Sequence, residues 1–503
     1  MDAAGALAQS AALVAALARR LDARLIETHI SWVLLAGDEA LKSKTPVRLP
    51  FLDFSTLEAR RQMCSEELRL NRRLAPQLYR EVVPITGSVA DPRPGGEGAA
   101  IEYALRMRRF ADGALLSERL AAGTLQAAAI DHLASHLAAF HRDAAVAAPD
   151  SPWGTAERVA ADLRGVLDGL AARAPAFDAA SWRAWADTEV ARLRPVWAER
   201  HRAGWVREGH GDLHLANVVV EGDEAVPFDC IEFDPGLRWI DVQADIGFLV
   251  MDLLAHERAE LAFRFLDRYL ADGGDYGGLA VLRFYLVYRA LVRALVASLR
   301  APGHAPAAAA YLALAERLRE PPGARLLVTH GLSGSGKSRL AAALVERCGA
   351  IRLRSDIERK RLHGLAASAS SGSAPGAGLY AADASTRTYE RLLALARGAL
   401  EAGWPTIVDA TFLRARERAA FRALARQLEV PFTLLHCEAP PVVLRERLRR
   451  RRGDASEADA AVLALQMQTQ QPLSHAERAS MLVAGPDADA GELGARWLAF
   501  KTR

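Results

Sequence analysis

The fold of the second half of this chain is decided by a single stretch, Gly331-Leu332-Ser333-Gly334-Ser335-Gly336-Lys337-Ser338. It matches the pattern G-x-x-x-x-G-K-[ST] without a mismatch. An apolar run at 326–328 precedes it, and a helix-like run at 340–345 follows it. A strand, a glycine-rich loop and a helix in this order predict a phosphate-binding loop, because glycine lets backbone N–H groups approach phosphate oxygens closely.

Each part of this loop has an expected task. The backbone is expected to wrap around the phosphates at Gly331, Ser333, Gly334, Ser335 and Gly336. Lys337 can reach the β and γ phosphates, and the Ser338 hydroxyl can bind Mg²⁺. The helix that follows points its positive end at the anion. The alternative is a glycine-serine turn without function, which the complete match in this setting argues against, so we expect the loop to bind ATP with Mg²⁺.

Downstream of the proline-containing segment 320–323, strand-like apolar runs alternate with helical patterns. Strands are predicted at 326–329, 351–354, 406–408, 432–436 and 481–484, and helices at 337–347, 385–402, 416–428 and 442–452. This alternation is typical of a parallel sheet with helices on both faces. We therefore predict that residues 321–503 form an α/β P-loop NTPase domain, whose ligands lie at the carboxyl ends of the strands.

Three further side chains of this domain are candidates for the site. Asp356 follows the second strand and can accept the proton of an acceptor hydroxyl, so we expect it to be catalytic together with Lys337. Asp409 ends the third strand in sequence and suits the orientation of Mg²⁺ or of its water. Arg447 belongs to a basic run, 445–452, that can close over the phosphates of ATP. The alternatives are capping roles for the two aspartates and a solvated helix face for the arginine run.

The first half of the chain follows a different order. In sequence, the pattern predicts a hairpin, a helix, a second hairpin and a mostly helical region, at 31–44, 57–74, 82–108 and 111–318. Residues 1–320 are therefore predicted to form an α+β domain, with a small β-rich lobe at about 25–108 and a larger helical lobe at about 109–320.

A polar constellation interrupts this helical region. The segment 210–217 reads His-Gly-Asp-Leu-His-Leu-Ala-Asn, and Asp229 follows it. Phosphoryl transfer needs a carboxylate that orients an attacking hydroxyl, and oxygen ligands that hold Mg²⁺. Asp212 suits the first task. Asn217 and Asp229 suit the second, since a hairpin turning at 222–223 would return Asp229 beside Asn217. The alternative is ordinary turn chemistry, which Asp and Asn favour.

These residues resemble the catalytic loop of the aminoglycoside and choline phosphotransferases, which are relatives of the protein kinases. The resemblance covers roughly residues 25–315 and implies a bilobal, protein-kinase-like domain. It also implies that Lys42 binds the α and β phosphates and that Glu67 is its ion-pair partner. Lys44 and Glu66 are rivals for these roles, and strand alternation cannot separate the two lysines because they share a face. We prefer Lys42 because it follows an apolar pair, as the family's lysine does.

The family pattern is incomplete at 27–32, where no glycine-rich loop joins the first two strands, so the nucleotide preference and the catalytic competence of this half stay open. Residues 325–485 resemble small P-loop kinases of the gluconate, shikimate, zeta-toxin and polynucleotide 5′-kinase group. The order of the two halves resembles bacterial proteins described as bifunctional aminoglycoside phosphotransferase/ATP-binding proteins. That description names likenesses and not a demonstrated drug-modifying activity.

We expect an enzyme with two ATP–Mg²⁺ sites, each suited to transferring a γ-phosphoryl group to the hydroxyl of a small molecule. One alternative is an ATP-driven regulatory protein whose first half is a catalytically silent binding module. Another is a nucleic-acid end kinase, which the net charge of +3 and the lack of aromatic residues in the run 445–452 do not favour. The sequence does not identify either acceptor, the oligomeric state or the ATP/GTP preference.

The composition is that of a folded, soluble protein, with 51% hydrophobic and 25% charged residues. The four cysteines lie far apart, so they predict buried free thiols in a reducing compartment. The N-terminal Ala/Leu run is broken by Arg19 and Arg20, which predicts an amphipathic helix instead of a signal peptide. We therefore expect a cytoplasmic protein that does not bind a membrane.

Overall fold

The computed structural model describes residues 3–49, 52–174, 176–299, 305–367, 369, 381–450, 456 and 458–500. The chain divides into two compact units. The first contains Met1–His136, Phe140–Arg158 and Ala198–Ile246, and the second contains Leu137–Ala139, Val159–Trp197 and Gly247–Arg503. The helices between residues 247 and 319 therefore belong to the same unit as the glycine-rich loop, although they precede it in the chain.

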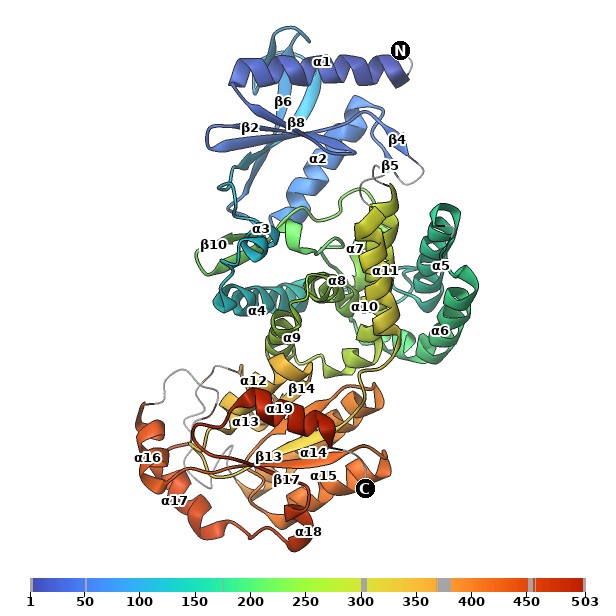
Figure 1. Cartoon of the computed structure of the whole chain (residues 1–503). Coiled ribbons are helices and arrows are strands. Elements are labelled where there is room, and N and C mark those ends of the chain that lie inside the picture. The colour runs from blue at the N-terminus through green and yellow to red at the C-terminus, as the bar shows by residue number, and fades with distance from the viewer. Residues whose placement is uncertain are drawn as a thin grey trace. The chain divides into compact units, whose positions relative to one another are not determined.

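An antiparallel sheet of six strands, in the order β1-β2-β3-β8-β6-β7, lies at the centre of the small lobe. Its strands are β1 (Arg24–Glu27), β2 (Ser31–Ala36), β3 (Glu39–Lys44), β6 (Tyr79–Gly87), β7 (Pro92–Pro94) and β8 (Glu102–Arg108). Helix α1 (Ala3–Leu21) covers one face and α2 (Leu57–Asn71) the other (Figure 1). Strand alternation explains this, since Trp32 and Leu34 are buried with α1, whereas Ala40 and Leu105 face the opposite way.

The remainder of the first unit consists of short elements around the polar constellation. The hairpin of β10 and β11 follows a single turn of 3-10 helix, η1, and a second antiparallel pair is formed by β9 and β12. These elements and their neighbours are β4 (Arg48–Leu49), β5 (Leu52–Asp53), α3 (Leu116–Ala121), α4 (Ala127–Asp143), β9 (Val206–Glu208), η1 (Leu215–Asn217), β10 (Val218–Glu221), β11 (Glu224–Pro227), α7 (Pro235–Arg238) and β12 (Trp239–Asp241).

Helices from the middle of the chain lie wholly or largely in the second unit. They are α5 (Ala156–Arg173), α6 (Ala179–Arg202), α8 (Val242–Ala255), α9 (Ala259–Gly273), α10 (Leu279–Leu299) and α11 (Ala305–Arg319), with the short η2 (Tyr276–Gly278) between α9 and α10. Across the part of the chain that the structure describes, no helix combines the length and the apolar character needed to cross a bilayer.

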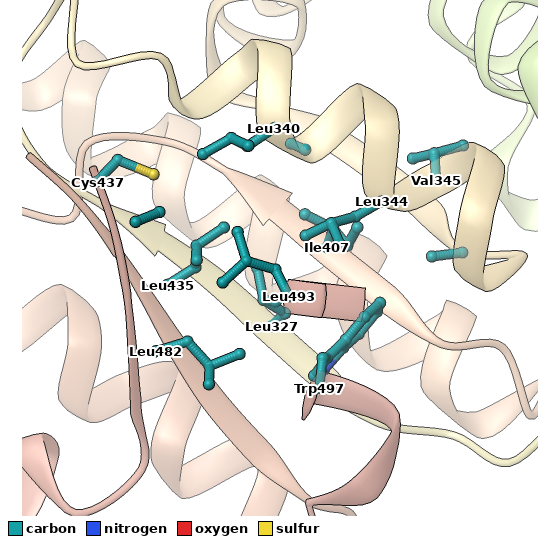
Figure 2. Close-up of a cluster of buried hydrophobic side chains, with 13 residues drawn as sticks. Leu327, Leu340, Leu344, Val345, Ile407, Leu435, Cys437, Leu482, Leu493 and Trp497 are labelled. Carbon is teal, nitrogen blue, oxygen red and sulfur yellow. The ribbon is translucent and has the colours of Figure 1, made fainter. Parts of the chain in front are cut away.

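The second unit also contains a five-stranded parallel sheet in the order β14-β15-β13-β16-β17. Its strands are β13 (Leu326–His330), β14 (Ile351–Arg354), β15 (Thr406–Asp409), β16 (Phe432–Cys437) and β17 (Met481–Ala484). The helices among them are α12 (Lys337–Cys348), α13 (Ser355–Leu362), α14 (Ala382–Glu401), α15 (Ala415–Gln427), α16 (Pro441–Arg450), α17 (Ala460–Thr469), α18 (His475–Arg478) and α19 (Ala490–Ala499). Figure 2 shows Leu344, Leu493 and Trp497 meeting Leu327 and Leu435 of the sheet, which fixes α12 and α19 on one face.

The fold class expected from the sequence is confirmed, because an α+β half with an antiparallel sheet precedes an α/β half with a parallel sheet. All four cysteines are free thiols, as expected, but Cys348 is only half-buried, which corrects the expectation that all four are buried. The predicted helix at 442–452 is described as α16, and Arg451 and Arg452 lie outside the described residues.

Candidate functional site

The loop between β13 and α12 has the backbone of a phosphate cradle. Gly331, Gly334 and Gly336 have φ angles of 136°, 86° and 96°, in the left-handed region that other residues rarely adopt. A Cβ atom at Gly334 would lie 2.9 Å from the carbonyl oxygen of Leu444, and one at Gly331 would collide with the carbonyl oxygen of Cys437. Glycine is therefore required at these positions by the loop itself and by the chain packed against it.

The charged end of the loop brings together residues from three elements. Lys337 is the first residue of α12, is 8% exposed, and its Nζ donates to the carbonyl oxygen of Leu332 at 2.8 Å. The Oγ of Ser338 donates to Oδ1 of Asp409 at 3.2 Å. Asp409 ends β15, so the predicted Mg²⁺ ligands do meet at the carboxyl edge of the sheet. A hydroxyl and a carboxylate oxygen at this separation form a donor set that fits a hard cation such as Mg²⁺.

A cavity of about 590 Å³ opens over this loop. Its walls include eight of the residues predicted from the sequence: Ser333, Gly334, Gly336, Lys337, Ser338, Asp356, Asp409 and Arg447. Gly331 and Ser335 also belong to the loop, but they are buried and are not among the residues that line the cavity. Nη1 of Arg447, on α16, lies 3.3 Å from the carbonyl oxygen of Gly334. The structure therefore gathers the predicted downstream residues around one cavity.

The part of the cavity beyond the loop is lined by side chains that the sequence did not single out. They include Tyr389 on α14, and Arg414 and Glu417 at the start of α15. Arg359, which sequence reasoning did name together with Lys360 as able to bind an anionic acceptor, lines the same cavity, and its Nη1 lies 3.5 Å from Oδ1 of Asp356. Burial raises the pKa of Glu417 above its usual value. This region presents both cationic and hydrogen-bonding groups to whatever occupies it.

Gln466 is a further residue that sequence reasoning missed. It lies on α17, and its Oε1 accepts a hydrogen bond from the backbone N–H of Ser333 at 2.9 Å. A side-chain carbonyl oxygen therefore occupies one amide of the glycine-rich loop. Nothing in the local sequence around Gln466 marks it, because its partner is 133 positions away in the chain.

In the first unit, the polar constellation forms as the hairpin prediction requires. The backbone N–H of Phe228 donates to the carbonyl oxygen of Asn217 at 2.9 Å, so β11 returns Asp229 next to Asn217. Nδ2 of Asn217 donates to Oδ2 of Asp212 at 3.0 Å. Asp229 has a φ of 66°, a conformation that costs a non-glycine residue free energy and is concentrated at functional sites. Asp212 and Asn217 are thus in direct contact, and the chain brings Asp229 next to Asn217.

Both rival lysines contact Glu67. Nζ of Lys42 lies 2.8 Å from Oε1 of Glu67 and 2.5 Å from Oδ1 of Asp229. Nζ of Lys44 lies 2.5 Å from Oε2 of Glu67 and also pairs with Glu232. The side chain of Lys42 is 13% exposed and that of Lys44 is 1% exposed. Lys42 is therefore the member of the pair that reaches the constellation, and Lys44 is enclosed.

The charges in this cluster stabilise one another. Burial alone raises the pKa of Glu67, but the ammonium groups of Lys42 and Lys44 hold it at about 2. Burial likewise lowers the pKa of Lys42, but the carboxylates of Asp229 and Glu67 raise it well above its usual value. The rival Glu66 lies elsewhere, with its carboxylate 2.7 Å from Arg69 and 2.9 Å from Arg238.

Asp245, on α8, supports the loop that carries Asp212. Its carboxylate accepts hydrogen bonds from the backbone N–H groups of His210 and Gly211, at 2.7 Å and 2.9 Å, and lies 3.1 Å from Nε2 of His141. Burial lowers the pKa of His210, and its Nδ1 accepts from the N–H of Asp212 at 3.2 Å, so this ring is neutral near pH 7. The sequence signal that could have found Asp245 is a carboxylate within an apolar helix.

The ionised form of Asp245 is expected to stabilise the fold. Burial alone raises its pKa, but the contacts with His141 and His210 hold the pKa below its usual value. Its contribution to stability is therefore complete above about pH 4, the usual pKa of aspartate, and declines as the pH falls below that value.

We expect Asp245→Asn to lower the free energy of unfolding by about 1–3 kcal/mol near pH 7, and the difference from the parent chain to shrink on acidification. Denaturant unfolding at several pH values measures this. Asp223→Asn, at an exposed turn, serves as the control, and a difference that grows on acidification would contradict the assignment.

The fold and the loop define the second half as a P-loop nucleotide-binding class of protein. A family model described as an AAA domain matches residues 326–473. The protein named "Uncharacterized protein Rv2004c" of Mycobacterium tuberculosis (strain ATCC 25618 / H37Rv) is 32% identical over 453 residues, covering 87% of this chain and 88% of that protein. "Uncharacterized protein Mb2027c" of Mycobacterium bovis gives the same values. The chain belongs to the family of these mycobacterial proteins.

Solved structures that are similar to parts of the chain include two that are named as kinases. A choline/ethanolamine kinase family protein from Mesorhizobium loti is 14% identical, with a TM-score of 0.38, and the match covers 62% of this chain and 96% of that one. A gluconokinase from Sinorhizobium meliloti is 21% identical, with a TM-score of 0.25, and the match covers 35% of this chain and 90% of that one. The expected succession of an α+β half and a P-loop half is confirmed by the strand order of the two sheets and by the family match over residues 326–473.

Proposed function

We propose that this chain is an ATP- and Mg²⁺-dependent phosphotransferase whose principal site is the cavity over the glycine-rich loop. The observation that carries the proposal is the meeting of Lys337, Ser338 and Asp409 at the wall of that cavity. An ammonium group, a hydroxyl and a carboxylate beside a ring of backbone amides are the groups that hold a triphosphate and its metal.

The other groups of the cavity support transfer to an acceptor. We propose that the carboxylate of Asp356 takes the proton of an acceptor hydroxyl while that oxygen attacks the γ phosphorus. The bond between the γ phosphorus and the β–γ bridging oxygen then breaks, and ADP leaves. Ser338 and Asp409 would hold Mg²⁺, which offsets phosphate charge. Arg447 would close over the nucleotide, and Arg359 suits an acceptor that carries an anionic group near its hydroxyl.

We propose a second site at the polar constellation of the first unit. Asp212 would orient an acceptor hydroxyl, and the oxygens of Asn217 and Asp229 would hold Mg²⁺. Lys42 would bind phosphate oxygens, in exchange for its contact with Asp229. Its partial exposure supports it over Lys44, whose enclosed ammonium group pairs with Glu67 and Glu232.

A labelling screen tests this proposal. The full chain is incubated with γ-phosphate-labelled ATP, Mg²⁺ and a library of small hydroxylated metabolites, alongside Lys337→Ala and Asp212→Asn. We expect the parent chain to transfer label to at least one acceptor. Loss of that label in Lys337→Ala would assign the reaction to the phosphate-loop site, and loss in Asp212→Asn would assign it to the polar constellation. ATP hydrolysis that no acceptor accelerates would favour the regulatory alternative. Label on oligonucleotide ends would favour the nucleic-acid kinase, and no turnover of ATP would refute the proposal.

A further inference from the structure

A buried ion pair connects the phosphate-loop site to a helix that precedes it in the chain. Arg352, on β14, is 9% exposed. Its Nε lies 3.1 Å from Oδ1 of Asp267 on α9, and its Nη2 lies 2.6 Å from Oδ2 of the same carboxylate. This is a bidentate pair, the geometry in which a guanidinium group is most firmly oriented. Asp267 lies outside residues 326–473, which the AAA-domain family model matches.

The remaining nitrogen of Arg352 faces the proposed metal ligands. Its Nη1 donates to the carbonyl oxygen of Ser338 at 3.1 Å and lies 3.9 Å from Oδ2 of Asp409. Nε of Arg354 lies 4.0 Å from the same oxygen of Asp409. Two guanidinium groups therefore lie at the outer limit of ion-pair distance from the carboxylate that would hold Mg²⁺, too far for a hydrogen bond. If either guanidinium group moved closer, it would compete with Mg²⁺ for the Asp409 carboxylate and would repel the Mg²⁺ ion.

The position of α9 beside β14 is fixed by further contacts within the second unit. Nη1 of Arg264 on α9 lies 2.9 Å from Oε1 of Glu346 on α12. Nη2 of Arg361 donates to the carbonyl oxygen of Ala271, at the end of α9, at 2.5 Å. These contacts hold α9, and with it Asp267, in a fixed position beside Arg352.

We propose that Asp267 is a positioning residue of the phosphate-loop site, which holds the Arg352 guanidinium away from Asp409 and so leaves that carboxylate available to Mg²⁺. This inference rests on the proposed function of that site. Asp267 also contributes a negative charge beside Arg352, in addition to that of Asp409. Without it, the surroundings of Asp409 gain one net positive charge, and Arg352 is free to turn toward Asp409. The charge balance around Asp409 at the phosphate-loop site therefore depends on a residue of α9.

The test measures, in an Asp212→Asn background that silences the other proposed site, how nucleotide turnover by the full chain depends on Mg²⁺ at saturating ATP and, by calorimetric titration, how tightly the chain binds Mg²⁺. We expect Asp267→Asn to raise the half-saturating Mg²⁺ concentration by about tenfold. The reason is that the Arg352 guanidinium, 3.9 Å from Asp409, loses its carboxylate partner and then repels a cation bound there. Asp272→Asn on the same helix, where Asp272 pairs with the half-exposed Arg268, is the control and is expected to leave the Mg²⁺ dependence unchanged.

A double variant separates positioning from packing. Asp267→Asn with Arg352→Gln removes both charges, so we expect it to restore most of the parental Mg²⁺ dependence. Asp267→Glu keeps the charge and is expected to stay within about threefold of the parent, which provides a readout if Asp267→Asn does not fold. An unchanged Mg²⁺ requirement in Asp267→Asn, a shift that the double variant does not relieve, or a large shift in Asp267→Glu would overturn the inference. Turnover in the parent chain that is independent of Mg²⁺ would instead overturn the proposed function, and the inference with it.

Discussion

Replacing Lys337 with alanine is expected to lower ATP turnover at the phosphate-loop site by roughly 10²–10³-fold, the usual cost of removing one charge-stabilising donor from a reacting centre. The ammonium group lies at the start of α12 and is held toward the loop by the carbonyl oxygen of Leu332. On binding, it would exchange that contact for phosphate oxygens, where negative charge is greatest. Its loss leaves the glycine backbone intact, so the fold should survive.

The measurement is steady-state turnover by the full chain in the Asp212→Asn background, so that only the phosphate-loop site reports. Arg347→Ala is the matched control, because Arg347 is an exposed cation on the same helix, α12, near its other end. We expect Arg347→Ala to retain parental turnover. Full turnover in a folded Lys337→Ala variant would show that the loop lysine is not part of the reacting site.

Replacing Asp212 with asparagine is expected to reduce turnover at the upstream site by roughly 10²–10⁴-fold while nucleotide binding persists, because that is the range for loss of a general base. The substitution keeps the shape of the side chain, and an amide oxygen can still accept from Nδ2 of Asn217, 3.0 Å from the present carboxylate oxygen. What is lost is the capacity to take a proton. A change in turnover without a change in binding therefore isolates the chemistry.

This measurement is made in the Lys337→Ala background, with nucleotide affinity determined in parallel. Asp223→Asn is the matched control, since Asp223 lies at the exposed turn between β10 and β11. Undiminished turnover in Asp212→Asn would refute the base role. No turnover at this site before the substitution would favour a binding module without catalysis.

The sequence predicted what local chain geometry determines. The loop conformation requires positive φ at Gly331, Gly334 and Gly336, and glycine adopts positive φ readily. The sequence motif therefore predicts the loop conformation directly. The turn at 222–223 likewise determined the return of Asp229 to Asn217 through backbone pairing. Parallel strands place their carboxyl ends at one edge, which brought Asp409 to the loop.

The choice between Lys42 and Lys44 could not be made from the sequence. Both point to the same face of β3, and the structure shows that both contact Glu67. They differ in what lies beyond Glu67: Asp229 for Lys42 and Glu232 for Lys44. Only the three-dimensional packing of the helix, the strand and the hairpin determines which ammonium group is enclosed.

The supporting residues were missed for a related reason. Asp245 contacts a backbone amide 35 positions away, Asp267 contacts an arginine 85 positions away, and Gln466 contacts an amide 133 positions away. No spacing rule connects such pairs, because their proximity is a product of tertiary packing. Residues that hold a site in place are therefore harder to predict than those that form the site itself.

The most direct test of the central claim is calorimetric titration of the full chain with Mg²⁺ and ATP, beside an identical titration of Lys337→Ala. We expect the parent chain to bind the nucleotide, and the variant to lose the component of the heat that belongs to the phosphate loop. Superimposable titrations of the two folded proteins, or no binding heat from the parent, would contradict a triphosphate site built on Lys337.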